Sequence, residues 1–121
     1  MKKKDKISII VPCYNEEQTL SIFYDEITKV AKEMKSVDFE FLFVNDGSKD
    51  QTLDILRELS SRDKRVRYIS FSRNFGKEAG MYAGLENATG DYVAIMDADL
   101  QDPPSMIDVM YHHIVEDGYD C

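Results

Sequence analysis

Long apolar runs are absent from this sequence of 121 residues. No stretch approaches the ~18 consecutive apolar residues of a membrane-spanning helix, and no segment resembles the apolar core of a signal peptide. Low-complexity segments and linkers are missing too. We therefore expect one domain at most, with no membrane span and no visible export signal in this stretch.

Cysteine is scarce, with Cys13 and Cys121 as the only two. Two cysteines make no disulfide framework, and the composition is typical of an intracellular, cytoplasmic chain. Cys13 follows an apolar run, so its expected role is that of a small packed side chain.

Positive charge is also in short supply, with 15 basic against 23 acidic residues and a net charge of −8. An acidic chain without a basic stripe is poorly suited to nucleic acid, so no nucleic-acid partner is expected. The basic residues at the start form a tail, 1–6, which we interpret as a solvated terminus rather than a membrane contact. The folded part is expected to cover 7–121.

Glycine-rich phosphate-binding loops are also absent from the sequence. The sequence contains no G-x-x-x-x-G-K-[ST] motif, and no G-x-G-x-x-G motif follows its first apolar run. This disfavours a P-loop enzyme and a dinucleotide oxidoreductase. A phosphate site in this chain would therefore have to use a metal and side chains.

What the chain does contain is an alternation of apolar, β-rich runs with helix-like segments. The predicted strands are 7–11, 39–44, 66–71 and 92–96. The predicted helices are 16–35, a segment that begins at Ser48 and runs through Leu59, 77–88 and 104–117. Repeated strand–helix units with apolar strands predict an α/β fold, in which helices cover both faces of a mainly parallel sheet.

Local signals predict how the helices begin and which faces they bury. Asn15 is expected to cap the first helix, and Ser48 with Gln51 has capping-box spacing for the second. The first helix is expected to bury Leu20, Phe23, Ile27, Val30, Ala31 and Met34. The last helix is expected to turn Met106, Val109, Met110 and Ile114 inward.

An acidic run, 97–102, directly follows the last predicted strand. Asp97 and Asp99 lie one residue apart at the mouth of this strand, where both cannot be ionised cheaply without water, hydrogen-bond donors or a cation. Among these, a divalent metal ion that binds a diphosphate accounts best for two carboxylates at this position. The plainer alternative is a solvated loop pair, with Gln101 as a bystander and Asp102 as a helix cap.

Polar clusters also follow the other three predicted strands. They are 12–16, 45–48 and 72–77. Ligands of parallel α/β sheets bind at the C-terminal ends of the strands, so we expect the four clusters to form one composite pocket. Each cluster has a plainer interpretation: 45–48 as a turn and helix cap, Arg73 and Lys77 as solvated charges, and Tyr14 as packing.

Four segments of the chain carry a resemblance to a known family. They are IIVPCYNEE (9–17), VNDGS (44–48), SRNFGK (72–77) and MDADLQDPP (96–104). In sequence and in order they resemble the family 2 glycosyltransferases. The resemblance is strongest to the polyprenyl-phosphate branch, which holds dolichol-phosphate mannosyltransferases and bactoprenol glucosyltransferases, and it extends from Ile7 to about Asp120.

The resemblance implies a Rossmann-like GT-A fold that binds a nucleotide-diphosphate sugar. The nucleoside pocket would be lined by Pro12, Tyr14 and Glu16. Asp46 would bond the base, with Asn45 in place of the first of the family's two acids. Arg73 and Lys77 would lie near the nucleotide or its phosphates.

The resemblance also implies a cofactor and a reaction. Asp97 and Asp99 match the catalytic acid pair that holds Mg²⁺ or Mn²⁺ at the diphosphate, and Gln101 matches a further ligand. The donor would be a UDP- or GDP-linked sugar. The acceptor in the full-length protein would be a lipid phosphate, glycosylated with inversion at the anomeric carbon.

Family members continue past this length with an acceptor-side region. We therefore expect this chain to be the donor-binding part of a truncated domain, with poor transfer activity by itself. The full-length protein is expected at the cytoplasmic face of the membrane, and uncovered apolar surface would permit a homo-oligomer.

Two other function classes stay open. A metal-dependent phosphotransfer enzyme often has its acid nucleophile after the first strand, where Cys13 and Tyr14 stand instead. A regulatory module of the receiver type needs a phosphorylatable acid after the third strand, where Ser72 and Arg73 stand. A nucleotide-binding module without catalysis would carry the same binding motifs as the enzyme.

Overall fold

The computed structural model describes residues 4–99 and 106–117, with side chains up to residue 111. Within these residues, strands and helices alternate along the chain as predicted. The elements are β1 (Asp5–Cys13), α1 (Leu20–Glu33), β2 (Val37–Asn45), α2 (Thr52–Arg62), β3 (Val66–Ser70), α3 (Lys77–Asn87), β4 (Tyr92–Ile95) and α4 (Met106–Asp117).

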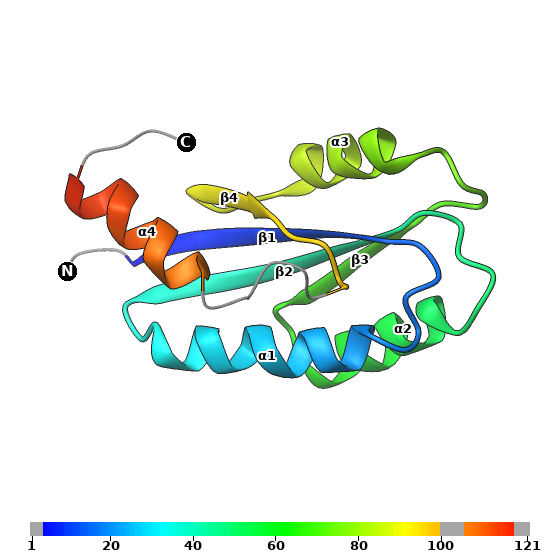
Figure 1. Ribbon diagram of the computed structural model, residues 1–121, viewed down its shortest axis with the longest axis horizontal. Helices are drawn as coiled ribbons and strands as arrows, with labels where there is room; N and C mark the ends of the chain where they lie inside the picture. The colour runs from blue at the N-terminus through cyan, green and yellow to red at the C-terminus, as the bar shows by residue number, and fades with distance from the viewer. Residues whose placement is uncertain (1–3, 100–105, 118–121) are drawn as a thin grey trace.

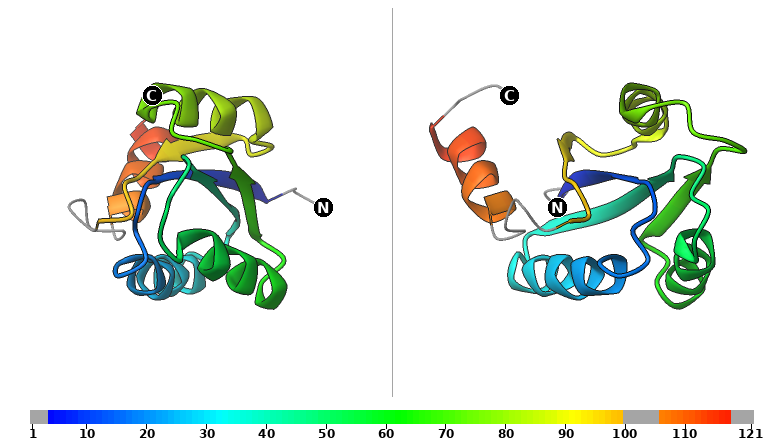
Figure 2. Two further views of the ribbon diagram at one scale, coloured as in Figure 1. Left: turned by 90° about the vertical axis from the view of Figure 1, so that its right-hand side faces the viewer. Right: turned by 45° about the vertical axis from the view of Figure 1, so that its right-hand side comes forward.

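The described strands form one parallel sheet in the order β3-β2-β1-β4. Helices α1 and α2 cover one face of this sheet and α3 covers the other, while α4 lies beside the N-terminal ends of β1 and β4 (Figure 1). Figure 2 shows the same layers from two further directions. The predicted parallel α/β architecture, with helices on both faces, is confirmed.

The main core lies between the sheet and the α1–α2 layer. Phe23 of α1 meets Phe43 of β2 edge to face, with ring centroids 6.2 Å apart. Every residue of the predicted inner face of α1 is buried. On β1, Ile9 and Ile10 point to opposite faces and are both fully buried, which explains why this strand is a continuous apolar run.

Helix α3 approaches the other face of the sheet through glycines. Gly80 and Gly84 are its buried residues among those described. A Cβ atom built on Gly84 would lie 2.4 Å from Cγ2 of Ile10, so the absence of a side chain lets the helix backbone approach β1 closely.

The predicted helix starts were wrong in two places. Helix α1 begins at Leu20 rather than at residue 16, and Asn15 has a φ of 53° and does not cap it. Helix α2 begins at Thr52, whose backbone N–H donates to Oδ1 of Asp50 (2.9 Å), so the capping box at Ser48 is not formed. Asn15 and Ser48 instead hydrogen-bond across two loops, as described below.

The inward face predicted for α4 was also wrong. Ile107 is buried, whereas the side chains of Met106, Val109 and Met110 are exposed. Tyr111 fixes this orientation, because its ring packs on Tyr92 and its hydroxyl donates to Oδ2 of Asp5 (2.7 Å). The predicted start at Pro104 and the side chain of Ile114 lie outside the described residues. None of the described helices has the length and apolar character needed to cross a bilayer.

Candidate functional site

A pocket of about 330 Å³ opens at the C-terminal edge of the sheet. Its lining residues are Pro12, Cys13, Tyr14, Glu16, Asp46, Lys77, Asp97 and Asp99. Every one of these except Cys13 was predicted as a site residue from the sequence. The volume falls in the range of roughly 300–1,000 Å³ typical of small-molecule sites. The structure therefore brings polar clusters from β1, β2, α3 and β4 into one pocket.

Among the predicted site residues that the structure describes, Arg73 is not one of the lining residues. Arg73 is exposed, and its guanidinium carbon lies 4.8 Å from the ring centroid of Phe75, a cation–π arrangement. Gln101 lies outside the described residues, as does Asp102. Their predicted roles stay predictions.

Lys77 and Asp97 form an ion pair in the pocket. The Nζ atom of Lys77, the first residue of α3, lies 2.9 Å from Oδ1 and 3.1 Å from Oδ2 of Asp97. Both side chains are partly exposed, so the pair contributes little to stability. It does place a positive charge at the carboxylate for which a metal was predicted.

The loop after β1 is fixed by hydrogen bonds to the loop after β2. The N–H of Asn15 donates to Oγ of Ser48, and the N–H of Lys49 donates back to Oδ1 of Asn15, both at 2.9 Å. The N–H of Glu16 donates to Oγ1 of Thr52, also at 2.9 Å. These bonds hold the segment that carries Tyr14 and Glu16 at the pocket, and they stabilise the positive φ of Asn15.

Asp46 is buried and orders the segment that leads into α3. Its Oδ1 accepts the N–H of Phe75 (2.7 Å) and its Oδ2 accepts the N–H of Gly76 (3.0 Å). Next to it, Gly47 has a φ of +70°, and a Cβ there would lie 2.2 Å from the carbonyl carbon of Arg73. The two backbones therefore touch. Each carboxylate oxygen of Asp46 keeps acceptor capacity, so its predicted bond to a base stays a prediction.

Cys13 lies under the pocket floor as a buried thiol whose Sγ–H donates to the carbonyl oxygen of Val11. Burial raises the pKa of this thiol, and the negative charges of Glu16 and Asp97 raise it further. The group is therefore a neutral packed side chain at neutral pH, as the sequence predicted. Its place in the pocket lining had no sequence signal beyond its position after the strand.

The pocket supplies some, but not all, of the oxygen ligands that a hard divalent cation needs. Asp97 and Asp99 place two carboxylates in one pocket, and carboxylate oxygens are preferred ligands of Mg²⁺ and Mn²⁺. Among residues 4–99 and 106–111, no group of three or more acidic, histidine or cysteine side chains is positioned to hold a metal. A cation here would take its remaining ligands from a bound phosphate, from water or from Gln101.

Comparisons with known proteins identify a family model and several relatives that this chain matches. Residues 8–121 match the family model described as Glycosyl transferase family 2. The prophage bactoprenol glucosyl transferase homolog of Escherichia coli strain K12 is 46% identical over 111 residues, which are 92% of this chain and 35% of that protein. The chain thus spans about a third of the length of this curated relative.

Solved structures share the fold. TarS of S. aureus in complex with UDP-GlcNAc is 27% identical with a TM-score of 0.69, over 92% of this chain and 31% of that one. The mannosyltransferase PcManGT from Pyrobaculum calidifontis, in complex with GDP-Man and Mn²⁺, is 24% identical with a TM-score of 0.69, over 84% and 34% of the two chains.

Proposed function

Because this chain belongs to glycosyl transferase family 2, we propose that its pocket binds a nucleotide-diphosphate sugar and that the whole protein transfers the sugar to a polyprenyl phosphate. The observation that carries the proposal is the convergence of Tyr14, Asp46, Lys77 and Asp97 from four separate motifs on one pocket. The UDP-GlcNAc bound by TarS supports the class of donor. The name of the bactoprenol-related relative supports the class of acceptor.

The charges of the lining residues support a divalent cation as cofactor. The lining includes four carboxylates, of Glu16, Asp46, Asp97 and Asp99, against the one ammonium of Lys77. A diphosphate would add further negative charge and would be repelled unless a cation entered with it. When bound by Asp97, Asp99 and Gln101, Mg²⁺ or Mn²⁺ would stabilise the charge that develops on the leaving diphosphate.

The chain's own side chains would position the donor. We assign Pro12, Tyr14 and Glu16 to the nucleoside, since the two hydrogen-bonded loops hold this segment at the pocket. Asp46 is assigned to the base. Lys77 is assigned to the phosphates, because its ammonium already lies at the carboxylate of Asp97. Arg73, which is not among the lining residues, is assigned to the same phosphates on the family resemblance of its motif alone.

The chemistry of the acceptor explains why the site needs no strong base. A phosphate monoester is already ionised near neutral pH, so it attacks the anomeric carbon without losing a proton. Attack from the face opposite the leaving diphosphate inverts that carbon. A lipid acceptor would place the full-length protein at the cytoplasmic face of a membrane, and a homo-oligomer stays a prediction.

Calorimetric titration with UDP, GDP, UDP-glucose and GDP-mannose, each with and without Mn²⁺, tests the proposal. We expect the chain to bind either the uridine or the guanosine compounds, with an affinity that depends on Mn²⁺. Circular dichroism serves as the control for folding. A folded chain that binds none of the four in the presence of Mn²⁺ would contradict the proposal.

A further inference from the structure

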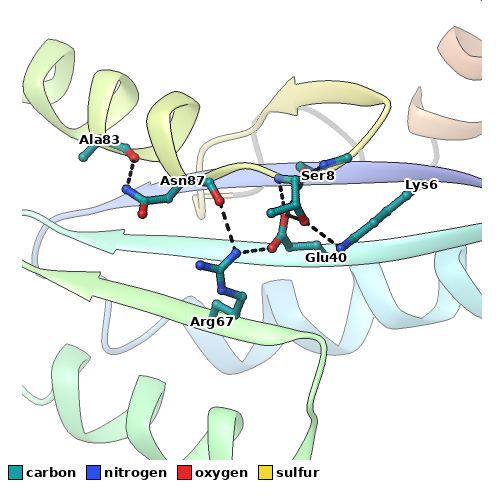
Figure 3. Close-up of polar contacts among 8 residues, drawn as sticks. Lys6, Ser8, Glu40, Arg67, Ala83 and Asn87 are labelled. Carbon is teal, nitrogen blue, oxygen red and sulfur yellow. Dashed lines mark hydrogen bonds and ion pairs between the residues drawn. The ribbon is translucent and has the colours of Figure 1, made fainter.

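A buried carboxylate lies on the α3 face of the sheet, away from the pocket. Glu40 of β2 is 3% exposed, and its Oε2 accepts bonds from Oγ of Ser8 (2.7 Å), from the N–H of Thr89 (3.0 Å) and from Oγ1 of Thr89 (3.2 Å) (Figure 3). Its Oε1 is paired with Arg67 of β3, which also donates to the carbonyl oxygen of Asn87 at the end of α3 (3.1 Å). This carboxylate therefore joins three strands and α3.

The same network fixes the connection from α3 to β4. The N–H of Gly90 donates to Oγ of Ser8 (2.8 Å), and Nζ of Lys6 donates to Oγ1 of Thr89 (2.7 Å). Asp91 and Lys6 exchange two bonds, one from each backbone N–H. A Cβ at Gly90 would lie 2.6 Å from Oγ of Ser8, so the backbone of this connection packs directly against β1. Residues 89–91 are thus each held to the first strand or to Glu40.

Apolar packing holds α3 weakly and leaves one side of β4 exposed. The buried residues of α3 are two glycines, and its large side chains Tyr82 and Leu85 are more than half exposed. Strand β4 has four residues and lies at the edge of the described sheet, where Val93 and Ile95 are both 42% exposed. The placement of α3 consequently depends largely on polar contacts. The opposite face of β4, with Tyr92 and Ala94, packs on the main core, so β4 is held by both polar and apolar contacts.

Site residues lie at or just beyond the ends of both elements that are distant from Glu40. Lys77 is the first residue of α3, whose 11 residues give it a length of about 16 Å. Asp97 stands four residues beyond Val93, the residue paired with Ser8, which is about 13 Å along an extended chain. Asp97 is also held by its neighbours Met96 and Ala98, which are buried in the main core. A shift at the connection would therefore move Lys77 relative to Asp97 and disturb the pair that they form.

We propose that Glu40 is a positioning residue, which holds the α3–β4 connection and thereby sets the position of Lys77 relative to Asp97 in the pocket. The expected effect of a change at Glu40 on ligand affinity rests on the proposed function. Its expected effect on the placement of α3 is independent of that function.

A matched pair of substitutions tests the proposal. Glu40→Gln removes the charge with little change in shape. Asp63→Asn does the same to a carboxylate at the α2–β3 turn, which accepts three bonds from Arg65 and one from Tyr24. We expect Glu40→Gln to raise the Kd of the Mn²⁺–nucleotide complex about tenfold and Asp63→Asn to leave it within about twofold.

Amide hydrogen exchange gives a readout that needs no ligand. Under conditions where both variants are fully folded, Glu40→Gln is expected to accelerate exchange in 77–81 and 96–97, relative to the parent. Asp63→Asn is expected to leave these segments unchanged. Equal effects of the two variants on both readouts would overturn the proposal and leave Glu40 with a purely structural role. If Glu40→Gln fails to fold, Ser8→Ala, which removes one donor and keeps the charge, replaces it.

A second pair of substitutions, in α3 itself, leaves Glu40 unchanged. Gly84→Ala places a methyl group 2.4 Å from Cγ2 of Ile10, so the helix must shift away from β1. Gly80→Ala meets Val44 at 3.7 Å and Pro12 at 4.0 Å, which are ordinary contacts that require no shift. We expect the first to weaken nucleotide binding about tenfold and the second to leave it unchanged. If the parent binds no nucleotide, the proposed function fails, and the exchange experiment still decides the role of Glu40.

Discussion

The Nζ atom of Lys77 lies 2.9 Å from Oδ1 of Asp97, so the start of α3 is joined to the segment that follows β4, two residues beyond its end. Both partners line the pocket. A divalent cation at Asp97 would therefore compete with the ammonium for the same carboxylate, while a diphosphate would attract the ammonium away.

This competition predicts effects of opposite sign for Lys77→Met. Removal of the ammonium should strengthen the binding of Mn²⁺ alone about threefold, since the pair is partly exposed and contributes little energy. The same variant should bind the nucleotide in the presence of Mn²⁺ more weakly than the parent. Calorimetry of both ligands measures the two effects. Lys29→Met, an exposed lysine of α1 paired with Glu26, is the control and should change neither.

Two glycines near the pocket should respond differently to alanine. Both Gly47 and Gly76 have positive φ, so Gly76→Ala should cost about 1–2 kcal/mol of unfolding free energy from backbone strain. Gly47→Ala adds a contact of 2.2 Å with Arg73 and should cost about 3 kcal/mol or more. Urea denaturation of the two variants measures the difference. Equal losses would contradict the close backbone contact at Gly47.

Acid should remove stabilisation supplied by two carboxylates. Burial raises the pKa of Glu40, but bonds from Ser8, Thr89 and Arg67 outweigh it and lower the pKa to about 2. Burial likewise raises the pKa of Asp63, and bonds from Arg65 and Tyr24 lower it to about 2. The folded-state values lie below the unfolded ones of 4.5 and 3.8.

The stabilisation is therefore complete above about pH 4.5 and lost as the pH falls toward about 2. Glu40→Gln and Asp63→Asn should each flatten the fall of unfolding free energy measured by urea denaturation between about pH 6 and pH 2. A slope identical to that of the parent in either variant would show that its carboxyl group titrates normally in the folded chain.

The thiol of Cys13 should react slowly. Because burial raises its pKa, the thiolate that attacks alkylating reagents is rare near neutral pH. Iodoacetamide labelling, followed by mass spectrometry of the peptide that contains Cys13, should show little product in the folded chain and full product in urea. Rapid labelling under native conditions would show that the pocket floor opens.

Much of the fold was predictable because the strands are apolar runs buried on both faces, as in 39–44, where Phe41 and Leu42 are both fully buried. The pocket was predictable because parallel strands bring the loops at their C-terminal ends together. Tyr14, Asp46 and Asp97 therefore meet although they are distant in the chain.

Other features depended on contacts that no local pattern contains. The caps predicted at Asn15 and Ser48 failed because each side chain bonds to the other loop. The prediction of the inner face of α4 was wrong because Tyr111 packs on Tyr92 and sets the orientation of the helix. Glu40 interrupts an apolar strand, but its donors Ser8 and Thr89 are 32 and 49 residues away, so only the fold shows that it is satisfied.

The most direct test of the central claim is the Mn²⁺ dependence of nucleotide binding in Asp97→Asn/Asp99→Asn. A control double variant, Asp25→Asn/Asp54→Asn, makes the same change in net charge at exposed positions of α1 and α2. We expect the parent and the control to bind the nucleotide more tightly with Mn²⁺ and the pocket variant to lose this gain. The same gain in all three proteins would contradict a metal site at Asp97 and Asp99.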